Sequence, residues 1–195
     1  VYEYALSQMG RCVKNDTIPD ELFRQYTVNR GLRDLNGKGV LTGLTNISEI
    51  TSFKDVDGKR VPIDGELWYR GYDVRTLMRM FADDRYAYEI ITYLLLFGEL
   101  PSVEEKNEFL TILAAARDLP TYFVRDVIMK APTKDVMNSM TRSILTLAAY
   151  DPYAQQTDLG NVIRQCLMLI TVFPMLAIYG YHAYNHYENL ESMNI

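Results

Sequence analysis

GELWYRGYDV, residues 65–74, is the stretch that decides the fold of this chain. It holds the chain's single tryptophan, Trp68, and it is too rich in glycine and aromatic residues for the interior of a helix. We predict a short β-strand over residues 66–69 that turns at Gly71. Asp73 is then placed to act as the N-cap of the helix that follows it.

A second segment, YLLLFGELP at residues 93–101, is typical of the end of a buried helix. Gly98 suits the C′ position, where a left-handed backbone closes a helix. Ser102-Val103-Glu104-Glu105 follows directly and has the pattern of a capping box. The sequence therefore predicts one helix that ends at Phe97 and another that begins after Ser102.

The residues before this region predict two short helices and a small hairpin. Both helices lie within residues 1–33, and the second is expected to be capped by Thr17 and stopped by Gly31. Extended chain is expected at residues 40–42 and 44–47, because these segments suit a strand. Asp55-Val56-Asp57-Gly58 is a turn signal, so we expect a β-hairpin near residues 39–72.

After Asp73 the pattern of apolar residues predicts helix almost throughout. Thr133 and Asp158 are the expected caps of the last two helices, and Pro174 is the expected site of a kink. The predicted helices cover residues 74–82, 86–97, a segment that begins after Ser102, 122–129, 134–150 and 158–187. The fold class is thus mainly α, with residues 1–36 as an amino-terminal helical extension and residues 37–195 as the main domain.

Composition excludes several classes of protein. The chain has 195 residues, of which 48% are hydrophobic and 23% charged, as in an ordinary globular domain. Its net charge of −5 does not attract phosphate backbones, so nucleic acid is not an expected partner. Only Cys12 and Cys166 are present, which excludes a disulfide scaffold. We predict a cytoplasmic protein without a signal peptide.

Residues 165–187 contain no Asp, Glu, Lys or Arg and so resemble a membrane span in part. A span needs about 20 mostly apolar residues, and the second half of this segment is too polar. Tyr179, Tyr181, Tyr184 and Tyr187 alternate there with small residues, which favours close packing against another helix. We interpret the segment as a long helix in a core or a subunit interface, and we expect no membrane partner.

Three local patterns in the sequence resemble ligand sites. His182 and His186 stand four residues apart, but zinc needs a third or fourth ligand, and local hydrogen bonding is the preferred interpretation. Asp55, Asp57 and Gly58, with Glu66 eleven residues after Asp55, resemble a calcium loop. Lys59 and Arg60 stand where that loop needs an acid or amide and then a glycine, so we interpret the segment as a charged hairpin turn. No metal ligand is predicted.

The glycines of residues 37–43 do not have the spacing of a dinucleotide-binding loop, and they precede a predicted strand rather than a helix. Arg30, Arg33 and Lys38 form a basic cluster nearby. An anionic ligand or a solvated basic edge would each explain that cluster. No pairing of a nucleophile with a base is visible in the sequence.

Four motifs together resemble the citrate synthase family, in the order and spacing of its N-terminal portion. They are GELWYRGYDV (65–74), YLLLFGELP (93–101), LAAYDP (147–152) and PMLAIYGYHAY (174–184). The resemblance covers residues 31–188 and implies the first part of that family's large helical domain. It also implies a homodimer, or a larger assembly, formed through the helices near residues 136–150 and 158–187.

The resemblance implies a condensation of acetyl-CoA with oxaloacetate. In the family, an aspartate removes a methyl proton, one histidine stabilises the enol, a second activates the oxaloacetate carbonyl, and arginines hold the carboxylates. Those residues lie in motifs after the region matched here, so no catalytic residue is assigned. His182 and His186 do not match the catalytic motifs. Arg33 is the one residue to which the resemblance assigns a ligand, the phosphate of CoA, and neither a covalent cofactor nor a metal is implied.

We therefore expect the N-terminal part of a citrate synthase-type enzyme, inactive by itself and resembling bacterial members of the family at its N-terminus. Two alternatives stay open: part of a 2-methylcitrate synthase-type enzyme, or a non-catalytic helical dimerisation module of the same fold.

Overall fold

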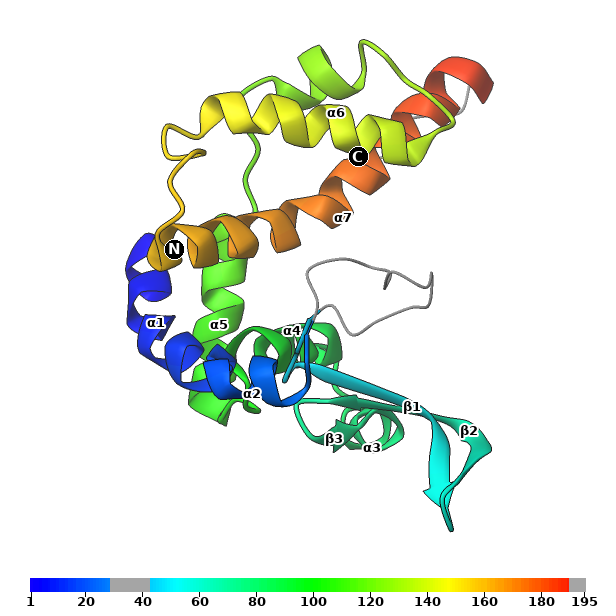
Figure 1. The fold of residues 1–195 in the computed structure, drawn as a ribbon. Coiled ribbons are helices and arrows are strands. Elements are labelled where there is room, and N and C mark those ends of the chain that lie inside the picture. Colours follow the sequence, from blue (N-terminus) through cyan, green and yellow to red (C-terminus); the bar gives the residue numbers. More distant parts are fainter. Residues whose placement is uncertain (29–42, 190–195) are drawn as a thin grey trace. The chain divides into compact units, whose positions relative to one another are not determined.

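A computed structural model describes residues 1–28 and 43–189 of the chain, and these residues are mainly helical (Figure 1). The helices are α1 (Tyr2–Asp16), α2 (Asp20–Gln25), α3 (Val74–Met80), α4 (Ala87–Phe97), α5 (Val103–Ala116), α6 (Val136–Leu147) and α7 (Leu159–Asn189). A π-helical turn, η1 (Val124–Ile128), and a 3₁₀ turn, η2 (Ala148–Tyr150), lie among them. The strands are β1 (Ser48–Val56), β2 (Lys59–Tyr69) and β3 (Tyr72–Asp73). The predicted fold class is confirmed.

The chain divides into two compact units. Unit 1 combines Val1–Met9 with the residues from Asn107 onward, and unit 2 contains Gly10–Lys106. The predicted boundary between residues 36 and 37 falls in a part of the chain that the structure does not describe, and it stays a prediction.

The sheet of unit 2 is antiparallel, with strand order β1-β2-β3. Ser48 pairs with Tyr69 at one end of the hairpin, and the register shifts between Thr51 and Phe53. Asp57 and Gly58 connect β1 to β2 with φ angles of 51° and 73°. Positive φ at both turn residues matches the twist of a hairpin, and an Asp-Gly pair tolerates it. The turn predicted at residues 55–58 is confirmed.

The junction between sheet and helix follows the prediction closely. Arg70 and Gly71 both have positive φ, 49° and 83°, and they carry the chain from β2 into β3. Asp73 then caps α3, because its carboxylate accepts a hydrogen bond from the Thr76 N–H at 3.0 Å. The signature segment is thus a strand, a tight turn and a capped helix.

The boundary between α4 and α5 also follows the prediction. Gly98 closes α4 with a φ of 85°, and its N–H donates to the Leu94 carbonyl. The Ser102 hydroxyl accepts from the Glu105 N–H, while the Glu105 carboxylate accepts from the Ser102 N–H. This reciprocal pair is a complete capping box. Four residues of α4 are buried in the core of unit 2: Ile90, Tyr93, Leu94 and Phe97.

Several predicted boundaries were wrong. Residues 44–47 do not form a strand. Thr17 does not cap α2, because its hydroxyl donates back to the Val13 carbonyl at the end of α1. Asp135, not Thr133, caps α6. The helix expected at 122–129 is reduced to the turn η1. Residues 40–42 and Gly31 lie outside the described residues.

The core of unit 1 forms where α6 and η1 pack on α7. Its buried members are Phe123, Ile128, Val172, Leu176 and Ala183. α6 and α7 approach closely at Gly180, where an added Cβ would lie 3.0 Å from the Ser139 Oγ. A larger residue would therefore push the two helices apart.

α7 begins after its predicted cap, since the Asp158 carboxylate accepts from the Asn161 N–H at 3.0 Å. The helix continues through Pro174, and Figure 1 shows that it does not run straight. Leu159–Glu188 is long and apolar enough to cross a membrane by length and composition alone. The core helix of a soluble protein meets the same criteria, so this finding is weak support for a span.

Candidate functional site

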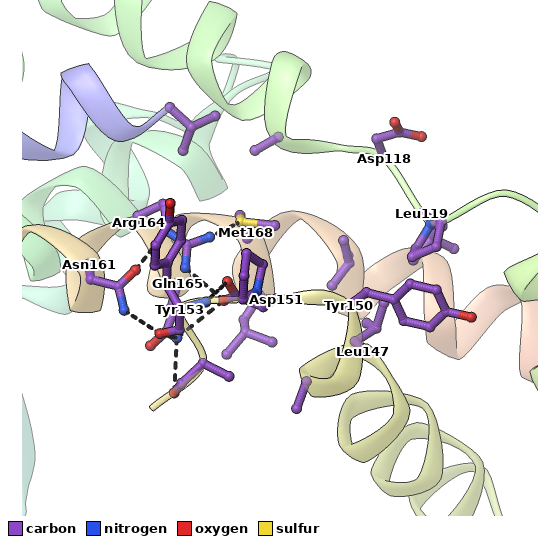
Figure 2. A pocket seen from close by; sticks show the side chains of 18 of the residues that line it. Asp118, Leu119, Leu147, Tyr150, Asp151, Tyr153, Asn161, Arg164, Gln165 and Met168 are labelled. Atoms are coloured by element: carbon purple, nitrogen blue, oxygen red, sulfur yellow. Dashed lines mark hydrogen bonds and ion pairs between the residues drawn. The ribbon is translucent and has the colours of Figure 1, made fainter. Parts of the chain in front are cut away.

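A pocket of about 980 Å³ lies in the described part of unit 1 (Figure 2). The connection after α5 and the loop after η2 form part of its wall, together with the first half of α7. Most of the side chains that line it are apolar. They include Leu119, Ile144, Leu147, Met168, Leu169 and Val172. A volume of this size lies at the upper end of the range for small-molecule sites.

A polar network forms one side of the pocket. Arg164 on α7 donates from Nη2 to the Asp151 carboxylate at 2.7 Å, and from Nε to the Asn161 side-chain oxygen at 2.8 Å. Gln165 adds a hydrogen bond to the same carboxylate at 3.3 Å. Figure 2 shows these three α7 side chains converging on Asp151 and Tyr153. The network therefore joins α7 to the loop after η2.

Asn161 fixes the shape of that loop. Its side-chain nitrogen donates to the Tyr153 carbonyl at 2.9 Å and to the Gln156 carbonyl at 2.8 Å. Asn161 is almost fully buried, so these bonds are shielded from water. The LAAYDP motif thus contains the last residue of α6 and all of η2, and it places Asp151 next to α7. Hydrogen bonds within the chain therefore hold this side of the pocket together.

Asp151 and Arg164 neutralise each other in the wall of the pocket. Burial by itself raises the pKa of the Asp151 carboxyl, but hydrogen bonds from Arg164, the Tyr153 N–H and Gln165 outweigh it, so the pKa lies below its ordinary value. The charged side chains of the lining are Asp118, Asp151 and Arg164, and Arg164 is already paired. An anionic ligand would meet no unpaired cationic side chain there. The pocket suits an apolar, uncharged occupant.

The histidines predicted to be local rather than metal-binding are found on α7. The rings of His182 and His186 lie edge-on to neighbouring tyrosines, Tyr181 and Tyr187, at centroid distances of 5.6 and 5.1 Å. Among the described residues no group of three His, Cys, Asp or Glu side chains is placed to hold a metal ion. His182 and His186 therefore do not belong to a metal site made of described residues.

The other sequence candidates fall outside a site. Arg30, Arg33 and Lys38 belong to the part of the chain that the structure does not describe, so the role assigned to Arg33 stays a prediction. Glu66 of the calcium-like pattern pairs with Lys54 across the hairpin at 3.3 Å, as in an ordinary charged ribbon.

Helices α6 and α7, predicted to form a subunit interface, leave many apolar side chains in water. The exposed large residues on them are Met137, Leu145, Val162, Phe173, Ile178, Tyr181 and Tyr187. Exposed apolar side chains in such number are typical of a surface that another chain covers. The interface itself stays a prediction.

The pair of Asp151 and Arg164 was missed by the sequence analysis. The two residues are 13 positions apart and lie on different elements, so no helical spacing brings them together. The sequence pattern at the start of α7 could have indicated this pair. An N-cap at Asp158 places Asn161 and Arg164 on one face of the helix, three residues apart, beside the loop that Asp151 begins.

Comparison with known proteins gives one family. Residues 34–194 match the family model described as "Citrate synthase, C-terminal domain". The chain is 29% identical over 119 residues to the "2-methylcitrate synthase" of Shewanella oneidensis, which covers 59% of this chain and 28% of that protein. It is 36% identical over 99 residues to the "Citrate synthase" of Haloferax volcanii, which covers 50% of this chain and 24% of that protein.

A solved structure has the same fold. The citrate synthase from Pyrobaculum aerophilum superimposes with a TM-score of 0.60 over 79% of this chain and 38% of its own length, at 24% sequence identity. Matches to curated relatives cover from 24% to 32% of the relatives' length. The chain therefore spans about a quarter to a third of the length of the curated relatives that it matches.

Proposed function

Because the chain belongs to the citrate synthase family, we propose that it forms part of an enzyme that condenses acetyl-CoA with oxaloacetate to give citrate and CoA. The main support for this proposal is the match of the family model to residues 34–194, which include all four motifs described above. The proposed reaction class is acyl transfer in which the acyl group becomes an alkyl group. Acetyl-CoA enters as a substrate, and no metal is invoked.

We propose that these 195 residues form the N-terminal part of that enzyme's large domain. In this proposal they have a structural role and contribute no catalytic residue. Two observations support a structural rather than a catalytic role. The histidines lie one turn apart on α7, next to tyrosines, and the arginine of the unit 1 pocket is paired with Asp151. Arg33 is proposed to contact the phosphate of CoA.

The test is a thiol-release assay. The purified 195-residue chain is mixed with acetyl-CoA and oxaloacetate, and free CoA is measured with a thiol reagent against a heat-treated sample and an active citrate synthase. No release above the heat-treated sample is expected. Release at an enzymatic rate would overturn the structural assignment, and it would leave the family membership intact.

A 2-methylcitrate synthase is the second candidate, favoured by the similarity to the Shewanella oneidensis protein of that name. The two enzymes differ by one methylene in the acyl group, propionyl-CoA in place of acetyl-CoA. A hydrophobic pocket separates such substrates by only about 1–3 kcal/mol. Competition of the two thioesters in the protein encoded by the complete reading frame decides between them, and the preferred thioester names the enzyme.

A non-catalytic helical dimerisation module is the third candidate, supported by the exposed apolar side chains of α6 and α7. All three candidates predict a homo-oligomer through these helices. Only the enzymes predict condensation by the complete protein. If the complete protein catalyses neither condensation reaction, the dimerisation module is the remaining candidate.

A further inference from the structure

The C-terminal end of α4 is closed by side chains from distant parts of unit 2. The last turn of a helix has carbonyls without partners inside the helix. Here the Leu95 carbonyl accepts from Arg70 Nη2 at 2.9 Å, and the Phe97 carbonyl accepts from Asn15 Nδ2 at 2.6 Å. The Leu96 carbonyl accepts a weaker bond from the Cys12 Sγ at 3.7 Å. Two of these three donors lie on α1.

Arg70 joins this helix end to the end of α1. Its side chain is only 4% exposed. It pairs with the Asp16 carboxylate and donates from Nη1 to the Asn15 carbonyl at 3.2 Å. A second bond from Nη1 reaches the Asn46 side-chain oxygen at 3.2 Å. A buried guanidinium that loses its carboxylate partner is strongly disfavoured, so Arg70 and Asp16 depend on each other.

The contact between α1 and the end of α4 is also tight. A Cβ added to Gly98 would lie 2.7 Å from the Cβ of Asn15. One turn earlier on α1, Arg11 forms an ion pair with Glu99 at 3.2 Å and lies over the ring of Tyr93 at 5.6 Å. Two successive turns of α1 therefore contact the same helix end.

Apolar burial contributes little to this contact on the α1 side. Of residues 10–16, only Cys12 is buried. Segments held by polar side chains with little buried apolar surface are the ones that open locally before the rest of a protein unfolds. Residues 10–16 also lie outside the family match, which begins at residue 34.

We propose that residues 10–16 of α1 act as a strap that closes over the end of α4 and over Arg70. The strap opens as a unit while the rest of unit 2 stays folded. Its release exposes the carbonyls of the last turn of α4 and leaves Arg70, at the centre of the signature segment, without its carboxylate. The amino-terminal helix thereby controls the order of the junction between β2 and α3, whatever the reaction of the complete protein.

Cys12 provides a direct probe of strap opening. In a Cys166→Ser background it is the single thiol, and alkylation by N-ethylmaleimide followed by mass spectrometry reports its exposure. Asn15→Ala removes one hydrogen bond to α4, and Asp16→Asn removes the charge that pairs with Arg70. Each loss is expected to increase the labelling rate about tenfold or more. Asp126→Asn, which breaks the exposed pair with Arg125 in unit 1, is the matched control and should leave the rate unchanged.

The dependence of labelling on urea separates local from global opening and needs no strap variant. Local opening exposes little surface, so the Cys12 labelling rate of the background protein should be nearly constant at low urea. A rate that rises with the slope of global unfolding, followed by circular dichroism, would overturn the strap. Equal labelling of Asn15→Ala, Asp16→Asn and the control would also overturn it.

Discussion

Helices α4 and α7 are both markedly apolar, and they differ in what covers them. α4 buries four large side chains within unit 2, and the carbonyls of its last turn all have partners. In α7 only 28% of the most apolar window is buried. Apolar composition alone therefore does not tell whether the apolar surface of a helix is buried by its own chain. α4 finds its partners in unit 2, whereas α7 presents an apolar surface for which we propose a second subunit.

The largest expected effect lies in the covered helix. Phe97→Ala on α4 should reduce the free energy of unfolding by about 3–5 kcal/mol, because a fully buried ring in edge contact with Tyr93 is replaced by a cavity. Tyr88→Ala on the same helix is the matched control, since Tyr88 is 64% exposed. Urea unfolding followed by circular dichroism measures both. Similar losses for the two variants would show that α4 is not covered as described.

Substitutions on the exposed face of α7 should weaken self-association rather than destabilise the folded chain. Tyr181→Asp or Ala177→Arg on α7 places a charge in the proposed interface, and Tyr181 is 55% exposed in the single chain. The expected cost to association is about 2 kcal/mol or more, with unchanged secondary structure. Light scattering over a concentration series measures it. The same mass for the parent chain and both variants would remove the proposed interface.

Local chemistry explains why the signature segment could be predicted from the sequence. An N-cap, a C′ glycine and a capping box act over three or four residues, so Asp73, Gly98 and the pair of Ser102 and Glu105 were found correctly. Where two polar residues compete for one helix start, the same rules fail. Asp135 caps α6 although Thr133 is also a permitted cap, and the Thr133 hydroxyl instead accepts from the Asp135 N–H.

Contacts between distant residues were not predictable in this way. β1 starts at Ser48 rather than at residue 44 because β2 ends at Tyr69, its pairing partner. Arg70 meets Asn15 across 55 positions of the chain, and Asp151 meets Arg164 from another element. Each of these contacts depends on the packing of elements, which one sequence does not encode as a spacing.

A smaller effect is expected on the covered side of α7. Gly180→Ala should destabilise the protein by about 1 kcal/mol, because the new Cβ would lie 3.0 Å from the Ser139 Oγ on α6. Gly10→Ala on α1 is the matched control, since its Cβ would meet no atom within 4 Å. Alanine favours a helix, so the control should be stabilised by about 0.5–1 kcal/mol. Thermal unfolding of the two variants should shift in opposite directions, and shifts of the same sign would contradict the close packing of α6 on α7.

The smallest expected effect is the acid dependence of the pocket network that anchors the start of α7. The folded-state pKa of Asp151 lies below its ordinary value of about 3.9, so folding favours the carboxylate. The stabilisation is therefore present above about pH 4 and is lost as the pH falls through the folded pKa. Asp151→Asn should lower stability at pH 7, and its difference from the parent chain should shrink below about pH 4.

Asp126→Asn provides the reference for a pair in water. Arg125 lowers the pKa of the Asp126 carboxyl through a hydrogen bond, but both side chains are exposed and salt screens the pair. Urea unfolding of both variants at pH 7 and pH 3 measures the contrast. The half-buried Asp151 network should show the larger loss at pH 7, and that loss should persist in 0.5 M salt because burial shields it from screening. If the two variants lose stability equally, the Asp151 carboxylate contributes no more to stability than a carboxylate in a surface pair.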